Sequence, residues 1–342
     1  MGKTWTGEEL AILKLNYGKQ AISTWAYKLP NKSQYAIRRK AFDLGMKSAL
    51  RNKDAVPVFE DLRLPPSDAQ IEEIWKALIS YQGKSKGLST QQETANISID
   101  TDKPVMVCFL ADLHIGAVSG KYKELKERID LIASTPNAFV ISAGDTVDNY
   151  LPSFHSQGQF DVICPPEIQK RLVEYIFSQL ESKLLALVQG CHDEGSHEAD
   201  DFDWTKYLTD KFGCVNLGFG GFVNLKVGKQ LYKIAVRHKY RFNSSTNLTS
   251  TVKRMREQLG DFDIGCIAHN HQAAIETAVL GDKIERVFVR PGSFKGADRY
   301  ARSIGFTDTG AQIPTVILFP NKRQMLPFLN IGDAVDVMRA FR

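Results

Sequence analysis

Short apolar runs alternate with amphipathic stretches over the second two thirds of the chain. Val105–Leu110, Ala138–Ser142 and Leu184–Val188 are continuously apolar, which is typical of strands buried on both faces. Between them, residues 121–134 and 166–182 carry apolar residues at helical spacing. The alternation predicts an α/β fold in which helices join parallel strands.

The first fifty residues have a different pattern, typical of short helices. Thr6 and Glu9 have the spacing of a capping box and open a helix predicted from about residue 6 to 17. Two further apolar stripes follow, the first ended by a proline and the second opened by Ser33. The residues expected to face the core of this three-helix bundle are Trp5, Ile22, Trp25, Ala26, Leu29, Tyr35, Ile37, Ala41 and Leu44.

Composition divides the chain into three parts. Residues 1–48 form the predicted helical bundle, and residues 104–342 form the α/β body. Residues 49–103 are typical of a linker, with one short helix from Ile71 to Tyr81 and a stretch rich in Gly, Ser, Thr and Gln over residues 82–102. At least part of this linker is expected to be flexible and to tether the bundle to the body.

Charge separates the same parts. The net charge is +5, yet residues 1–50 hold nine Lys or Arg against three acids, so the positive surplus lies in the bundle. A basic unit joined to a nearly neutral body indicates a module that binds a polyanion. Five scattered cysteines without a CxxC pair favour a reducing, cytoplasmic environment, and no apolar run has the length of a membrane span.

Residue types that bind metals follow the predicted strands of the body. Five segments are involved: Asp112-Leu-His114, Gly144-Asp145-Thr-Val-Asp148-Asn149, Gly190-Cys191-His192-Asp193, Arg237-His238 and Ala268-His269-Asn270-His271. A single histidine is more often structural than a ligand. Because the carboxyl ends of parallel strands meet at one edge of a sheet, five such segments predict a shared site.

The order D-x-H, G-D-x-x-D, G-N-H-D, H and G-H-x-H is the signature of the calcineurin-like metallophosphoesterases. Residues 108–271 resemble this signature segment by segment, and the resemblance covers roughly residues 104–320. It implies a two-sheet αββα sandwich, here preceded by the small helical bundle, with two divalent metals where the strands end.

The resemblance also implies roles for individual residues. Asp112, His114 and His271 would bind one metal, His238 and His269 the other, and Asp145 both. Water activated by both metals would attack phosphorus. His192 would assist at the phosphate with Asp193 orienting its ring, and Asp148 would support a ligand. Mn is the expected metal.

Cys191 and Ala268 depart from the family pattern, which has Asn and Gly at these positions. The change to Ala268 is small. A Cys191 thiolate would favour Zn or Fe at the second metal, whereas a bystander cysteine would leave that metal one ligand short. A nucleophilic cysteine is disfavoured, because the other ligands would then lack a purpose.

The bundle resembles Myb/SANT-like helix-turn-helix domains over residues 5–45, which implies that it binds DNA. Gln34, Arg38, Arg39 and Lys40 would then face the nucleic acid from the third helix, although a solvated helix face has the same composition.

After another predicted strand, Arg290, Ser293 and Lys295 belong to a Pro-Gly-Ser turn that would either contact a phosphate or serve as a plain turn.

Together these patterns predict a two-metal phosphodiesterase that hydrolyses nucleic acid, with a DNA nuclease as the leading interpretation and duplex DNA as the partner of residues 1–48. A phosphomonoesterase or a phosphodiesterase for a small nucleotide is the alternative enzyme. A DNA-binding protein with a degenerate metal site is the alternative outside enzymes, and Cys191 is the feature that favours it.

Overall fold

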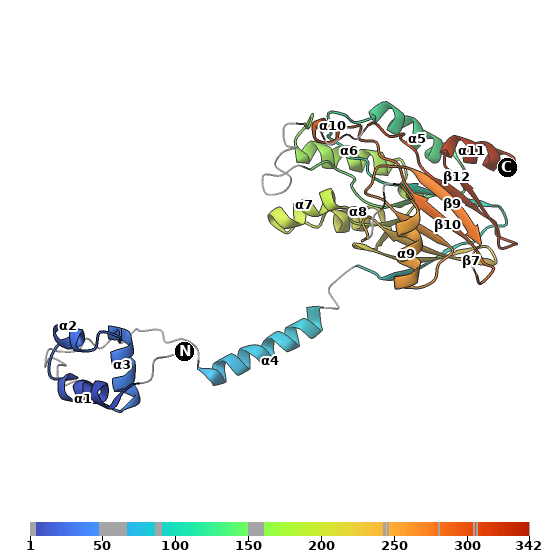
Figure 1. Cartoon of the computed structure of the whole chain (residues 1–342). Helices are drawn as coiled ribbons and strands as arrows, with labels where there is room; N and C mark the ends of the chain where they lie inside the picture. Colours follow the sequence, from blue (N-terminus) through green and yellow to red (C-terminus); the bar gives the residue numbers. More distant parts are fainter. Residues whose placement is uncertain are drawn as a thin grey trace. The chain divides into compact units, whose positions relative to one another are not determined.

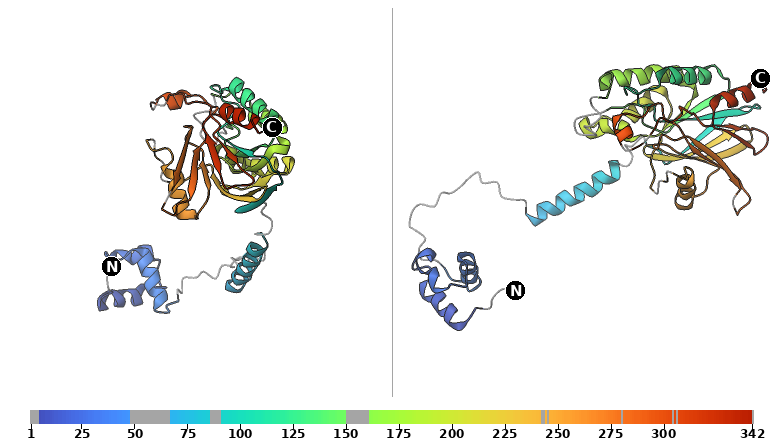
Figure 2. Two further views of the ribbon diagram at one scale, coloured as in Figure 1. Left: turned by 90° about the vertical axis from the view of Figure 1, so that its right-hand side faces the viewer. Right: turned by 45° about the horizontal axis from the view of Figure 1, so that its top comes forward.

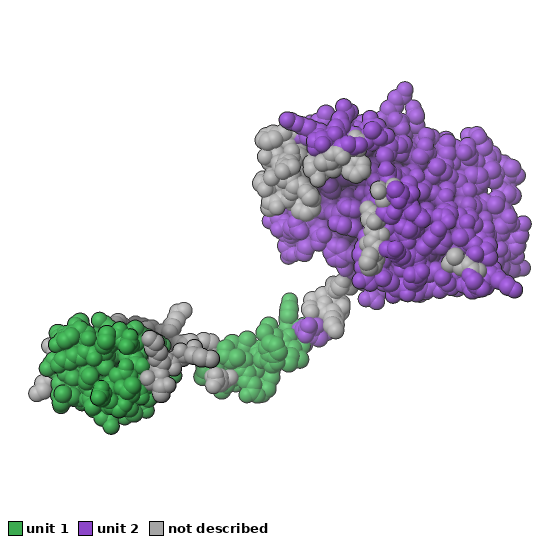
Figure 3. All heavy atoms as spheres, in the orientation of Figure 1, with its two compact units in different colours: residues 1–81 green, residues 82–342 purple. Residues whose placement is uncertain are grey.

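The structure is a computed structural model that describes residues 5–47, 67–85, 91–149, 161–241, 244, 246–279, 281–303, 305 and 307–341. The chain divides into two compact units, Met1–Tyr81 and Gln82–Arg342, which Figure 3 colours separately.

The first unit contains α1 (Gly7–Asn16), α2 (Ile22–Trp25), η1 (Ala26–Lys28) and α3 (Gln34–Asp43). The predicted capping box at the start of α1 is confirmed, since Thr6 and Glu9 exchange side-chain to backbone hydrogen bonds. The core of the bundle consists of Leu13, Trp25, Leu29, Ile37 and Ala41, all buried. Three short helices of this kind were predicted from the sequence.

Two predictions of inward-facing residues in this bundle are wrong. Tyr35 is 74% exposed and Leu44 is 42% exposed. Tyr35 precedes the buried Ile37 by two positions, which places the two side chains on opposite sides of a helix. Leu44 caps the end of α3, beyond the last core turn. Trp5 is only half-buried and packs under Lys32, whose Nζ lies 5.0 Å from the ring.

The helix α4 (Asp68–Ser85) is longer than the predicted helix from Ile71 to Tyr81. Its large apolar side chains are at least half exposed; they are Ile71, Ile74, Trp75, Leu78, Ile79 and Tyr81. Part of the predicted linker forms a strand of the second unit. This strand, β1 (Thr94–Ile99), pairs in parallel with β6 (Gly220–Val227), and its residue Ala95 packs in the core between the sheets.

The second unit is built on two six-stranded sheets. One has the order β1-β6-β7-β8-β10-β9 and the other β12-β11-β2-β3-β4-β5. The remaining strands are β2 (Val105–Leu110), β3 (Ala138–Ser142), β4 (Leu184–Leu187), β5 (Val215–Asn216), β7 (Gln230–Arg237), β8 (Ile264–Ile267), β9 (Ala274–Val279), β10 (Glu285–Arg290), β11 (Thr315–Leu318) and β12 (Met325–Phe328).

Helices cover the outer faces of the two sheets. Figures 1 and 2 show α5 (Tyr122–Ser134), α6 (Pro166–Ser178) and α11 (Ile331–Arg339) on one side and α9 (Ser250–Leu259) on the other. The other helical segments are η3 (Glu181–Lys183), α7 (Cys191–Asp200), α8 (Trp204–Phe212) and α10 (Arg299–Ser303). The predicted two-sheet αββα sandwich, preceded by a small helical unit, is therefore confirmed.

Alternating residues of β2 belong to different core layers. Met106, Cys108 and Leu110 pack in the layer that also holds residues of α5, α6, α8 and α11. Val105, Val107 and Phe109 pack in the layer between the two sheets. Side chains of a strand alternate between its faces, so a strand buried on both faces needs the continuous apolar run from which β2 was predicted.

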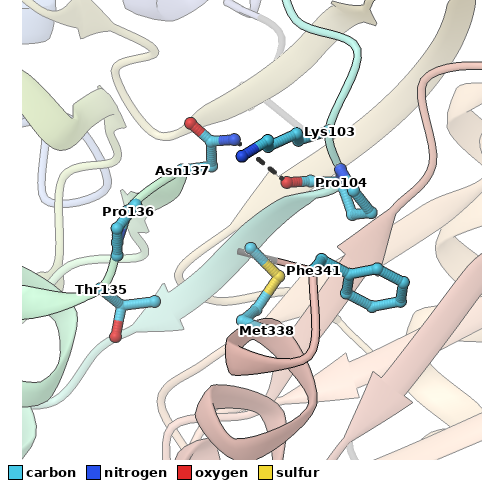
Figure 4. A pocket seen from close by; sticks show the side chains of 7 residues that line it. All are labelled: Lys103, Pro104, Thr135, Pro136, Asn137, Met338 and Phe341. Carbon is cyan, nitrogen blue, oxygen red and sulfur yellow. Dashed lines mark hydrogen bonds between the residues drawn. The ribbon is translucent and has the colours of Figure 1, made fainter.

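Strand direction determines where polar loops meet. The neighbours β2, β3 and β4 are parallel, and so are β7, β8 and β10 in the other sheet. The loops that follow β2, β3, β4, β7 and β8 leave from the carboxyl ends of these strands. Ligands bind at these ends in such sheets. A small hollow of about 140 Å³ lies at the opposite, amino ends of β2 and β3, between Pro104, Asn137 and Met338 (Figure 4).

None of the described helices combines the length and the apolar composition needed to cross a bilayer.

The place of β1 in the sandwich can be tested with two substitutions on one strand. Ala95→Asp would bury an unpaired carboxylate and should lower the free energy of unfolding by at least about 3 kcal/mol. Ser98→Asp, on the exposed side of the same strand, should change it by less than about 0.5 kcal/mol. Urea unfolding followed by tryptophan fluorescence measures both. Equal effects would place residues 94–99 outside the core.

Candidate metal centre

The predicted ligand residues come from five loops that follow β2, β3, β4, β7 and β8. Five of these residues have backbone dihedrals in the left-handed region: Asp112, His114, Asp145, His269 and His271, with φ between 45° and 74°. This conformation is uncommon for residues other than glycine, and it collects at functional sites where the surrounding structure enforces it. The backbone is therefore strained where the ligands lie.

A first cluster consists of Asp112, His114 and His271, whose donor atoms lie within 4.8 Å of one another. The Nε2 atoms of His114 and His271 are 3.1 Å apart. The Nε2 atom of His271 lies 3.7 Å from Oδ1 of Asp112. Two nitrogens and a carboxylate oxygen thus converge on one point, as ligands of a divalent cation do.

A second cluster consists of Asp145, Cys191, His238 and His269, again with donor atoms within 4.8 Å of one another. Nδ1 of His269 lies 3.2 Å from Nε2 of His238 and 3.3 Å from Sγ of Cys191. Oδ2 of Asp145 lies 3.1 Å from Nε2 of His238. The second cluster therefore offers one oxygen, two nitrogens and one sulfur.

Asp145 joins the two clusters. The same Oδ2 atom that faces His238 lies 3.8 Å from Nε2 of His114 in the first cluster. Its other oxygen, Oδ1, accepts a hydrogen bond from the backbone N–H of His192 at 2.8 Å. A carboxylate placed in this way is suited to bridge two cations only about 3.5–4 Å apart.

Electrostatics in the clusters fit bound cations. Burial lowers the pKa of His114 and His269 to about 4 and also lowers the pKa of His271, which keeps these imidazoles neutral and able to act as ligands. Burial, together with the charge of Asp145, raises the pKa of Asp112 to about 7. Oδ1 of Asp112 is buried without a hydrogen-bond partner. A divalent cation would satisfy this oxygen and favour the ionised carboxylate.

His238 and Asp145 form a buried pair in the second cluster. Burial alone would lower the pKa of His238, but the Asp145 carboxylate raises it well above its ordinary value. Burial alone would raise the pKa of Asp145, but His238 and His192 lower it well below its ordinary value. Nδ1 of His238 lies 2.8 Å from the carbonyl of Ala143, which leaves Nε2 directed into the cluster.

Asp148 and Lys295 support the first cluster. Oδ1 of Asp148 lies 3.0 Å from Nδ1 of His114, so His114 presents Nε2 to the cluster. The Nζ atom of Lys295 lies 3.0 Å from the same oxygen and 3.0 Å from Oδ2 of Asp298. The ion pairs and the hydrogen bond form a chain from Asp298 through Lys295 and Asp148 to His114.

His192 lies beside the clusters, with its ring centroid 4.6 Å from that of His114. Its Nδ1 atom is 2.6 Å from the carbonyl of Asp148. The expected orientation of this ring by Asp193 is wrong. The Asp193 carboxylate accepts hydrogen bonds from Thr146 and Gly190, so it holds the loops after β3 and β4 together.

The three residues predicted around the Pro-Gly-Ser turn, Arg290, Ser293 and Lys295, all contact loops or side chains of the site. Ser293 donates its hydroxyl to the carbonyl of Asp112 at 3.1 Å, and Arg290 donates to the carbonyl of Ala268. Both are buried, as is Lys295. Each of the three has at least one protein partner, and a contact with a phosphate stays a prediction.

Some residues that support the site were not predicted to do so, although Thr146 and Asn149 lie inside the segment Gly144–Asn149. Thr146 accepts a hydrogen bond from the indole of Trp204 at 3.0 Å, and Asn149 donates to the carbonyl of His192 at 2.9 Å. Asp298 lies outside every motif. Their roles depend on contacts between segments that are distant in the sequence, which spacing alone does not reveal.

The predicted nucleic-acid-binding residues lie on α3 in the first unit. Gln34, Arg38 and Arg39 are exposed and Lys40 is half-buried. Arg39 pairs with Asp43 at 3.4 Å within the same helix. Two aromatic residues, Tyr35 and Phe42, are exposed on this helix as well, and they were not among the residues predicted to bind nucleic acid.

Comparisons with known proteins give similarity only to solved structures. The sequence matches no protein-family model, and it matches no curated protein. A predicted phosphoesterase from Streptococcus pneumoniae is 13% identical over 66% of this chain and 97% of its own, with a TM-score of 0.31.

Two further solved structures are similar at the same level. Vps29 from Entamoeba histolytica, complexed with zinc, is 15% identical over 66% of this chain and 98% of its own, with a TM-score of 0.34. A metallophosphoesterase from Sphaerobacter thermophilus is 14% identical over 70% and 95%, with a TM-score of 0.32. Similarity this low carries no information on activity, which has to be inferred from the site itself.

The role of Lys295 can be tested without a substrate. Lys295→Met would leave the buried Asp148 without its cation and disturb the orientation of His114, so Mn²⁺ affinity should fall about 10- to 100-fold. Calorimetric Mn²⁺ titration measures this. Lys229→Met, at an exposed lysine in the turn between β6 and β7, is the matched control and should change the affinity little. Unchanged affinity in Lys295→Met would overturn the supporting role of Lys295.

Proposed function

We propose that this chain is a two-metal-dependent phosphodiesterase that hydrolyses nucleic acid, as a DNA nuclease whose first unit binds duplex DNA. The observation that carries the catalytic part is the pair of ligand clusters joined by Asp145. Sites that hold two cations a short distance apart are typical of phosphatases and nucleases.

The residues present fit two divalent cations. Asp112, His114 and His271 would hold one cation, Cys191, His238 and His269 the other, and Asp145 both. Bound cations would polarise a phosphoryl oxygen and make a water molecule acidic enough to attack phosphorus at neutral pH. The first cluster, with oxygen and imidazole ligands, suits Mn²⁺.

His192 is the proposed group for proton transfer at the phosphate. A proton on Nδ1 that is donated to the carbonyl of Asp148 fixes the orientation of the ring, and Nε2 is the nitrogen that we propose exchanges a proton with the leaving oxygen. The T-shaped contact with His114 keeps this ring beside the first cluster. His192 would therefore stabilise charge on the phosphoryl group or protonate the leaving oxygen.

The nucleic-acid part of the proposal depends on the first unit. The positive surplus of the chain lies within residues 1–50, and exposed Arg38 and Arg39 lie on α3 together with exposed Tyr35 and Phe42. Arginines contact phosphates and base edges, and aromatic rings stack on bases. This combination favours a nucleic-acid partner over a plain solvated helix.

Removing the bridging carboxylate should abolish catalysis. Asp145→Asn keeps the shape of the side chain but lacks the charge that joins two cations, so hydrolysis of an aryl phosphodiester and of DNA with Mn²⁺ should both fall at least about 100-fold. His271→Ala should have a similar effect. Asp210→Asn, at an exposed aspartate of α8, is the control and should retain full activity.

The outcomes for the wild-type protein separate the candidate functions. Cleavage of the aryl ester without cleavage of DNA or RNA would overturn the nuclease proposal and favour a small-nucleotide phosphodiesterase. Cleavage of phosphomonoesters alone would indicate a phosphomonoesterase. Metal-loaded protein that binds DNA and hydrolyses none of these substrates would be a DNA-binding protein with a degenerate site.

The binding face of α3 can be tested by charge reversal. Arg38→Glu/Arg39→Glu should weaken duplex binding and reduce the slope of log K against log salt by about 0.9 for each lost phosphate contact. Lys14→Glu/Lys19→Glu makes the same change in net charge away from α3 and should leave most of the affinity. Fluorescence anisotropy at several salt concentrations measures both. Equal losses would indicate a general charge effect.

A further inference from the structure

The second ligand cluster differs from the first in its chemistry. Its donors are one carboxylate oxygen, two imidazole nitrogens and the Sγ atom of Cys191, whereas the first cluster has no sulfur. A thiolate is a soft ligand that selects Zn²⁺, Fe²⁺ or Co²⁺ over Mn²⁺ and Mg²⁺. The two cation positions are therefore not equivalent.

The position of Cys191 is fixed by the backbone around Asp145. A Cβ atom on Gly190 would lie 2.0 Å from the backbone nitrogen of Asp145, so only glycine fits there. On the other side of Cys191, the N–H of His192 bonds to Oδ1 of Asp145. Both neighbours of Cys191 are thus held against the residue that joins the clusters, and Sγ is placed 3.3 Å from Nδ1 of His269.

Cys191 also differs from the other cysteines of the chain. Cys108 and Cys266 are fully buried in apolar layers, and burial raises the pKa of Cys108 and Cys214 to about 12. These residues pack as neutral thiols. Cys191 is the first residue of α7, and two imidazoles lie beside it, so its sulfur faces other donor atoms instead of an apolar layer.

We propose that Cys191 is a thiolate ligand of the second cation, so that the centre is heterometallic, with Mn²⁺ in the first cluster and Zn²⁺ or Fe²⁺ in the second. The proposal rests on the two-metal centre of the proposed function and is independent of the substrate. Of the two interpretations of Cys191, a metal ligand or a cysteine without a role at the metal, the proposal adopts the first.

Cobalt reports thiolate ligation directly. The full chain, freed of metal by a chelator, is titrated with Co²⁺ while metal content and near-ultraviolet absorption are followed. We expect two Co²⁺ per chain and a sulfur-to-cobalt charge-transfer band that accompanies one of them. Cys191→Asn should lose the band and keep its circular dichroism spectrum, which shows that it folds. Cys164→Ser, at a half-buried cysteine outside the clusters, should keep the band.

Each result bears on a different part of the proposal. Two bound Co²⁺ without the band, or a band that persists in Cys191→Asn, would overturn thiolate ligation and leave the two-metal centre intact. Absence of bound Co²⁺ in the wild-type protein would overturn the centre itself, and with it the proposed function.

Competition between metals tests the proposed inequivalence. When the wild-type protein is incubated with Mn²⁺ in large excess over Zn²⁺ and then freed of unbound metal, we expect about one of each per chain, because N and O ligands alone also prefer Zn²⁺ to Mn²⁺ at equal concentrations. Cys191→Asn, which replaces sulfur by an amide oxygen, should shift the ratio toward Mn²⁺. The same ratio in both proteins would show that residue 191 does not select the metal.

Discussion

The carboxylate of Asp145 is the interaction on which the architecture of the site depends. It lies between two groups of ligands and accepts the N–H of His192, and the loop after β4 approaches so closely that residue 190 has to be glycine. Gly144, before it, has φ of 93° and contacts the same loop. The ends of β3 and β4 are therefore locked around one charged group, and the ligands of both clusters are positioned relative to it.

The buried ionisable residues of the two clusters lower the stability of the fold, and other interactions of the surrounding structure compensate for this loss. Left-handed backbone at five ligand positions and several desolvated ionisable groups each oppose folding. Two apolar layers that bury both faces of β2 and β3 stabilise the fold, and so do the ion pairs from Asp298 through Lys295 to Asp148. Bound cations would stabilise the fold further, because they bind the folded chain in preference to the unfolded chain.

The sequence predicts what depends on local pattern. Continuous apolar runs predict β2, β3 and β4, and the residue types that follow them predict the donor residues that the structure brings together in two clusters, because parallel strands bring their carboxyl ends together. Contacts between distant segments were not predictable. Polar β1 lies in a stretch of linker-like composition and is held by β6, and Asp193 bonds to Thr146 across 47 positions instead of to its neighbour His192. Tyr35 is exposed because it lies on the opposite side of α3 from the buried Ile37, and the apolar residues of this helix were wrongly predicted to share one face.

The rigidity of the loop after β4 has a consequence for residue 191. Because Gly190 and His192 are both held against Asp145, the backbone at residue 191 does not depend on the side chain that it carries. A different side chain at this position would therefore leave the backbone of His192 and the carboxylate of Asp145 in place. In the proposed centre, such a change would alter the preference for one cation while the donor atoms of the first cluster stay where they are. The proposed metal preference at residue 191 is thus separable from the rest of the centre.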